Sequence, residues 1–140
     1  MILVIFEDSD DDFDTVCEAV KQSGVAVEVQ RATTGGGGLV LLGKLAAARS
    51  VPVLMNLNTP GTDGFEALAA IKANPTLKAI PVVAFSTSAN PREVGSVYAA
   101  GVNAHHVKPV RYPDHLQLVI DLVGYWFGRV VLPSVGGNNP

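Results

Sequence analysis

Short apolar segments recur along the chain and are separated by polar or glycine-containing stretches. Met1–Phe6 is a continuous apolar run, which is typical of a strand buried on both faces of a sheet. Val25–Ala32 instead alternates apolar and polar residues, which also indicates a strand. Together with three later runs, these segments predict five strands, at residues 1–6, 25–32, 51–57, 80–85 and 104–107.

The stretches between these runs carry apolar residues at helical spacing. Phe13, Val16 and Val20 predict a first helix, and Gly24 supplies its end. Thr33–Gly38 is predicted to be a loop, because a run of four glycines is a poor helix former. The other predicted helices are Leu39–Ala48, a segment from Phe65 to about Asn74, a segment capped by Ser88 or Asn90 that ends at Gly101, and a long segment from Leu116 to Phe127.

The alternation of strand and helix predicts an α/β domain with a parallel sheet and helices on both faces. We expect one domain over residues 1–128 and a C-terminal tail over residues 129–140. In such sheets, ligands bind beyond the carboxyl ends of the strands. Functional residues should therefore come directly after the predicted strands.

Composition narrows the class of protein. The chain has 140 residues, a formal net charge of −3, 48% hydrophobic residues and 16% charged residues, which argues against disorder. The slightly acidic balance argues against nucleic-acid binding, and no apolar run approaches the ~20 residues that span a bilayer. Cys17 is the only cysteine, so no internal disulfide can form, and Met1–Phe6 lacks the basic lead of a signal peptide. We therefore expect a cytoplasmic protein.

Polar side chains follow four of the predicted strands. They are two carboxylates, two amides, a hydroxyl and an ammonium group: Glu7, Asp8, Asn56, Asn58, Ser86 and Lys108. Neighbouring carboxylates repel each other, and a bound cation relieves that repulsion. Oxygen ligands of this kind suit Mg²⁺, and a lysine beside a hydroxyl suits the oxygens of a phosphoryl group.

These residues resemble the response-regulator receiver domain of two-component signalling. The resemblance covers nearly the whole chain and rests on Glu7-Asp8, the stretch NLNTPGTDG at 56–64, Ser86 and Lys108-Pro109. It implies a five-stranded doubly wound sheet of strand order 2-1-3-4-5, as in flavodoxin-like folds. It also implies a stand-alone signal relay that is not an enzyme.

The end of the chain resembles a narrower group within this family. YWFG at 125–128 and VVLP at 130–133 are similar to the single-domain receivers that partner bacterial phytochrome kinases. The partner that this resemblance implies is a histidine kinase, with a bacteriophytochrome as the candidate. Output would then pass through protein–protein contact.

At the first and third strand ends, the resemblance implies a Mg²⁺ site. Asp8 would bind the ion directly, and Glu7 would bind it directly or through water. The main-chain carbonyl of Asn58 would be a third ligand, and Asn56 a weak one. At the other two strand ends, the resemblance implies a response to phosphate.

Ser86 would hydrogen-bond the phosphoryl group, and Lys108 would pair with it. His105 stands where the family usually carries an aromatic switch residue. Phosphate would draw in Ser86 and shift the face of the following helix, as a population shift between two states.

Position 56 departs from the family pattern, in which an aspartate accepts the phosphate. Asn56 carries a neutral amide, which is a poor nucleophile, so phosphorylation at this position should be blocked. The substitution also removes one negative charge and weakens Mg²⁺ binding. Two interpretations stay open: a native Asn56 in a phosphate-independent pseudo-receiver adaptor that docks a kinase or partner protein, or an introduced substitution that freezes the unphosphorylated state.

Several other motifs have simpler structural explanations. The acidic residues among 10–14 favour a helix start through the macrodipole. The G-x₄-G-K spacing at 38–44 lies within a predicted helix and lacks a following Ser or Thr, so it does not indicate a nucleotide site. His105 and His106 are neighbours on a strand and point to opposite faces, so they do not share a metal. Acid at the strand ends disfavours a flavodoxin-like cofactor binder.

The last predicted helix carries two apolar stripes. One, expected to face the core, consists of Leu116, Val119, Ile120, Val123 and Phe127. The other consists of Leu118, Leu122 and Tyr125. A helix that is apolar on two faces usually meets a second partner. We therefore expect a homodimer contact through this helix and the tail, with packing of the tail on its own domain as the alternative.

Overall fold

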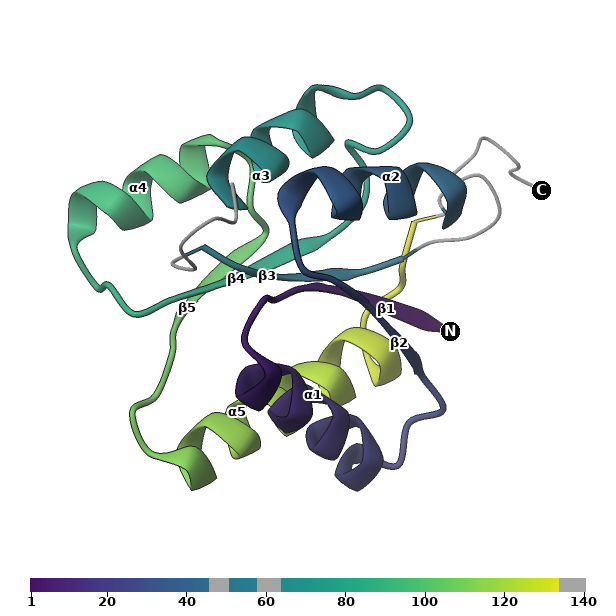
Figure 1. The fold of residues 1–140 in the computed structure, drawn as a ribbon, viewed down its shortest axis with the longest axis vertical. Coiled ribbons are helices and arrows are strands. Elements are labelled where there is room, and N and C mark those ends of the chain that lie inside the picture. Colours follow the sequence, from purple (N-terminus) through teal and green to yellow (C-terminus); the bar gives the residue numbers. More distant parts are fainter. Residues whose placement is uncertain (46–50, 58–63, 134–140) are drawn as a thin grey trace.

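The computed structural model describes residues 1–45, 51–57 and 64–133, and within these ranges strands and helices alternate regularly. The strands are β1 (Ile2–Phe6), β2 (Glu28–Ala32), β3 (Val53–Asn56), β4 (Val82–Ser86) and β5 (Ala104–Val107). The helices are α1 (Asp10–Ser23), α2 (Gly35–Leu45), α3 (Gly64–Ala73), α4 (Pro91–Ala99) and α5 (Tyr112–Gly128). The strands pair in parallel in the order β2-β1-β3-β4-β5, which confirms the predicted doubly wound fold (Figure 1).

Helices cover both faces of the sheet, with α1 and α5 on one face and α2, α3 and α4 on the other (Figure 1). Each face has its own hydrophobic cluster. Val4 and Phe6 belong to one cluster, and Leu3 and Ile5 belong to the other. The division follows from strand geometry, because successive side chains of β1 point to opposite faces. A strand buried on both sides is what the continuous apolar run predicts.

The parallel register aligns the carboxyl ends of the strands at one edge of the sheet. Asn56 pairs with Phe85, and Ser86 pairs with Val107. Backbone hydrogen bonds of 2.8–2.9 Å also hold the residues that directly follow β1, β3 and β5, through the N–H groups of Glu7, Leu57 and Lys108. The sheet backbone therefore positions the start of each loop at this edge.

The glycine-rich segment 33–38 differs from its prediction, because α2 begins at Gly35 and the predicted loop is wrong from there on. The reason is the close approach of α2 to the sheet. A Cβ atom on Gly38 would lie 2.1 Å from Cε2 of Phe6, so only glycine fits between the helix and this ring. Residues 46–48, which were also predicted to be helical, lie outside the described residues.

Other boundaries differ from prediction by a few residues. The second strand begins at Glu28 and not at Val25. The cap of α4 is Asn90 and not Ser88, because the Asn90 side chain accepts a 2.9 Å hydrogen bond from the Arg92 N–H. Among the described helices, none is both long and apolar enough to cross a lipid bilayer.

Candidate functional site

The predicted site residues that lie in the described ranges gather at the carboxyl edge of the sheet. Glu7 directly follows β1, Asn56 ends β3, Ser86 ends β4 and Lys108 directly follows β5. Asp8 lies next to Glu7 and is half-buried. Asn58, whose carbonyl was predicted to bind metal, lies outside the described residues.

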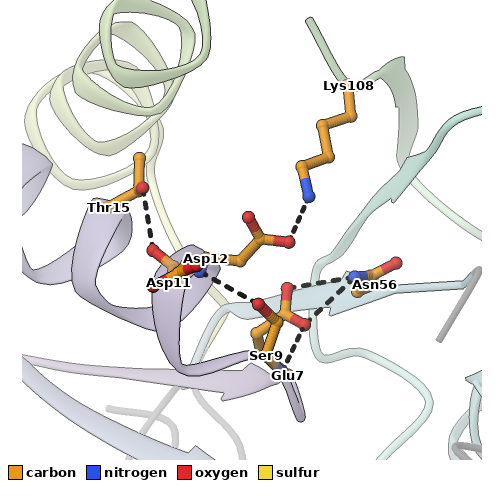
Figure 2. Close-up of polar contacts among 7 residues, drawn as sticks. All are labelled: Glu7, Ser9, Asp11, Asp12, Thr15, Asn56 and Lys108. Carbon is orange, nitrogen blue, oxygen red and sulfur yellow. Dashed lines mark hydrogen bonds and ion pairs between the residues drawn. The ribbon is translucent and has the colours of Figure 1, made fainter. Parts of the chain in front are cut away.

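Glu7 and Asn56 form the centre of the site (Figure 2). The Asn56 side-chain nitrogen donates to both carboxylate oxygens of Glu7, at 3.1 Å each. The backbone N–H of Ser9 donates to Glu7 Oε2 at 3.2 Å. Glu7 is only 5% exposed, and its burial raises the pKa of the carboxyl group, while the Ser9 and Asn56 hydrogen bonds oppose that rise. This buried carboxylate is therefore satisfied by neutral donors.

Lys108 forms an ion pair with Asp12, across the space between β5 and α1 (Figure 2). Ser9 caps α1 and accepts a 3.3 Å hydrogen bond from the Asp12 N–H. Asp12 therefore occupies the third position of the helix, from which its side chain turns back toward the sheet edge. The acidic run predicts only a helix start for Asp10, Asp11 and Asp12, and all three do lie in the first turn of α1. The Ser-x-x-Asp spacing was the signal for the additional role of Asp12.

His115 is a buried residue of α5 that the sequence analysis did not identify. Its ring meets the ring of Phe85 edge-on, with centroids 6.2 Å apart. Burial and the positive charge of Lys108 lower the pKa of His115, while Asp12 acts in the opposite direction. His115, Glu7, Asp12, Asn56 and Lys108 all line one small cavity of about 20 Å³, which is room for a single water molecule.

Arg31 of β2 also supports the site and was missed. Its Nε donates to the carbonyl oxygen of Glu7 at 2.8 Å, and its Nη1 pairs with Asp10 at 2.8 Å. The guanidinium also lies 4.8 Å from the ring centroid of Phe13. Arg31 therefore ties the end of β1 to the start of α1. The only sequence signal for this role is that Arg31 lies near the end of a predicted strand.

Ser86 and His105 share a groove of about 290 Å³ with residues of α4. Ser86 is buried, and its hydroxyl accepts a 2.9 Å hydrogen bond from the Ser88 N–H. Burial lowers the pKa of His105. His106 contacts Phe85 on the other face, at 5.6 Å between ring centroids, which agrees with the expectation that the two histidines point apart.

The described residues do not assemble a ligand set for a divalent cation in this arrangement. Both Glu7 oxygens accept hydrogen bonds from Asn56, and Asp12 is paired with Lys108. Within the described ranges, no group of three or more His, Cys, Asp or Glu side chains is placed to hold a metal ion. The carboxylate oxygens of Glu7 and Asp12 are of the type that Mg²⁺ prefers, but Asn56 and Lys108 are their present partners.

Known proteins resemble this chain over nearly its full length. No family model matches it. Response regulator Rcp1 of Synechocystis is 33% identical over 137 residues, which is 95% of this chain and 93% of Rcp1. The crystal structure of Mn²⁺-bound Rcp1 covers 94% of this chain and 98% of its own, with a TM-score of 0.83 and 31% identity.

Two further solved structures are also similar. The phosphorylated cyanobacterial phytochrome response regulator RcpA shares 34% identity and a TM-score of 0.85, and the match covers 95% of this chain and 98% of RcpA. A receiver domain from Rhodospirillum rubrum shares 29% identity and a TM-score of 0.89, over 98% of this chain and all of that one. These matches extend across the strands and helices that carry the site.

Proposed function

Because the chain belongs to the response-regulator receiver family of two-component signalling, we propose that it is a single-domain receiver with Asn56 at the phosphoacceptor position. The observation that carries the proposal is the placement of Asn56 at the end of β3, with its amide nitrogen directed at Glu7 (Figure 2). Rcp1, which this chain spans over 93% of its length, supports the single-domain assignment.

Asn56 blocks acyl-phosphate formation for a chemical reason. A carboxylate attacks phosphorus through an anionic oxygen, whereas an amide is neutral and a poor nucleophile. Ser86 and Lys108 take the supporting roles of hydroxyl donor and cation toward a phosphoryl group, and both lie at the same edge of the sheet. In the present arrangement Lys108 is engaged with Asp12, and Ser86 with the Ser88 backbone.

Mg²⁺ binds this edge weakly. Glu7 and Asp8 with the Asn58 carbonyl are the proposed ligands, and Asn56 contributes little. A cation must displace the Asn56 amide from Glu7, which opposes binding. The Mn²⁺-bound form of Rcp1 supports divalent-metal binding by this chain. When bound, such an ion neutralises carboxylates and phosphoryl oxygens.

The proposed partner is a histidine kinase, with a bacteriophytochrome as the candidate. The proposed location of this interaction is the cytoplasm. The description of RcpA as a phytochrome response regulator supports this choice. With phosphorylation blocked, the chain acts through contacts alone, as a pseudo-receiver adaptor that docks the kinase or another protein and performs no enzymatic reaction. Exposed apolar side chains on α4, β5, the loop that follows β5 and the start of α5 favour this adaptor role: Tyr98, Val107, Val110 and Tyr112.

The proposed function is tested by intact-mass analysis after incubation with acetyl phosphate and Mg²⁺. We expect the parent protein to keep its mass and Asn56→Asp to gain one phosphoryl group. The double variant Asn56→Asp with Lys108→Ala is the control, and it should gain much less. If Asn56→Asp gains nothing, the site is not a receiver site with one altered residue, and the proposal of a phosphoacceptor position at residue 56 fails. A phosphoryl gain by the parent protein would contradict the block at Asn56.

A further inference from the structure

The Glu7 carboxylate is unusual because it is buried beside other acids, and yet none of the described lysine or arginine side chains forms an ion pair with it. Three hydrogen bonds satisfy it, two from the Asn56 side-chain nitrogen and one from the Ser9 N–H. The basic side chains described at this edge, Lys108 and Arg31, are paired with Asp12 and Asp10 respectively. Neutral N–H donors therefore stabilise the negative charge of Glu7.

An aspartate at position 56 would replace this attractive contact with repulsion between two carboxylates. The Asn56 nitrogen lies 3.1 Å from each Glu7 oxygen, so a carboxylate of the same shape would bring two anionic groups to hydrogen-bond distance. Glu7, Asp8, Asp10 and Asp12 already place four acids at this edge, and the two basic side chains there, Lys108 and Arg31, pair with Asp12 and Asp10. Two neighbouring buried carboxylates do not both stay ionised without a cation or a proton between them.

We propose that the Asn56 amide replaces a divalent cation as the group that holds this edge together. The folded site then forms without metal, and Mg²⁺ adds little to its stability. This inference rests on the proposed receiver function, because that function makes this edge of the sheet a metal site. The observation that supports it is the contact between Asn56 and Glu7. The Asn56–Glu7 pair consists of one amide and one carboxylate, and the stability of the metal-free site depends on that combination.

The combination can be inverted within the same two positions. Glu7→Gln together with Asn56→Asp keeps one amide and one carboxylate in contact, with donor and acceptor exchanged. Asn56→Asp alone creates two carboxylates. Asn56→Ala removes the donor without adding a charge. These three variants separate the amide contact from the change in net charge.

The test is thermal unfolding followed by circular dichroism, in EDTA and in millimolar MgCl₂ at matched ionic strength, so that screening is constant. We expect the unfolding temperature of the parent protein to be the same in both solutions. Asn56→Asp should unfold about 5–10 °C lower in EDTA and recover most of that loss in Mg²⁺. The inverted double variant should respond to Mg²⁺ as little as the parent protein, and Asn56→Ala should be less stable in both solutions.

Two results would overturn the inference. One is a rise in the parent's unfolding temperature with Mg²⁺ as large as that of Asn56→Asp. The other is a Mg²⁺ response of the inverted double variant as large as that of Asn56→Asp. If Asn56→Asp does not fold at all in EDTA but folds in Mg²⁺, the inference is supported. A Mg²⁺-dependent Asn56→Asp that acetyl phosphate does not modify would contradict the proposed function while leaving this inference intact.

Discussion

At the scale of single residues, His115 is a buried titratable group at the site whose neutral form the fold favours. The side chain is 8% exposed, contacts Phe85, and lines the cavity between Asp12 and Lys108. Burial and the Lys108 charge both lower the pKa of His115 below its ordinary value near 6.5. Because the folded protein disfavours the protonated ring, the unfolded chain binds this proton more readily.

This difference predicts a pH dependence of stability. Just below pH 6.5 the unfolded state holds more protons on His115 than the folded state, so the free energy of unfolding falls as the pH falls. The contribution is complete above the unfolded pKa and is lost on the way down to the folded pKa, by at most about 1.4 kcal/mol per pH unit. Urea unfolding of the parent protein and of His115→Gln, between about pH 7.5 and 5.5, measures it.

We expect His115→Gln to lose less stability than the parent protein across this range. His105 and His106 also have pKa values lowered by burial, so a smaller dependence remains in the variant. Equal losses in the two proteins would show that His115 titrates alike in the folded and unfolded states.

At the scale of elements, α2 contains glycines with opposite roles. Gly43 is exposed in the helix interior, and an added Cβ would meet no atom within 4 Å. Gly43→Ala should raise the free energy of unfolding by about 0.5–1 kcal/mol, because alanine loses less backbone entropy. Gly38→Ala should lower it by about 1–3 kcal/mol, because the added Cβ overlaps the Phe6 ring.

Urea unfolding of the two variants against the parent protein measures this contrast. Each change adds one methyl group to the same helix, so each variant serves as the control for the other. Stabilisation by both changes would mean that α2 does not approach Phe6 as closely as the structure shows.

The same helix marks a limit of sequence-based prediction. Four glycines predict a loop from local propensity, but the start of α2 is stabilised by its contact with the sheet, which is a tertiary effect. Periodicity predicted β1, β5 and α3 closely, because their apolar patterns and flanking turn residues agree. Elements whose local and tertiary preferences coincide were therefore the ones that could be predicted.

At the scale of the whole molecule, the strand order determines which parts of the site could be foreseen. Parallel strands bring their carboxyl ends to one edge, so Glu7, Asn56, Ser86 and Lys108 were expected to converge there. Asp12 and His115 lie in the first turns of α1 and α5, the helices that follow β1 and β5. Their side-chain directions depend on how α1 and α5 pack against the sheet, which apolar spacing alone does not specify.

The faces of α5 also bear on assembly. Trp126 and Phe127 pack against their own core cluster, as do Leu118 and Leu122 of the second apolar stripe. Tyr125 remains 57% exposed. Packing of α5 within the domain therefore accounts for most of the second stripe, and a homodimer contact would centre on Tyr125 and the start of the tail.

We propose that the chain forms a homodimer through this smaller surface, in which Tyr125 joins Val131, which is 94% exposed. Tyrosine at the centre of an interface contributes strongly because it buries a large area with few rotatable bonds. Sedimentation velocity at tens of micromolar protein should therefore show a dimer for the parent chain and a monomer for Tyr125→Ser with Val131→Ser. Val40→Ser removes an exposed apolar side chain from α2 on the opposite face, and it should leave the dimer unchanged. A parent protein that sediments only as a monomer would refute the dimer, and the exposed side chains would then be ordinary surface residues.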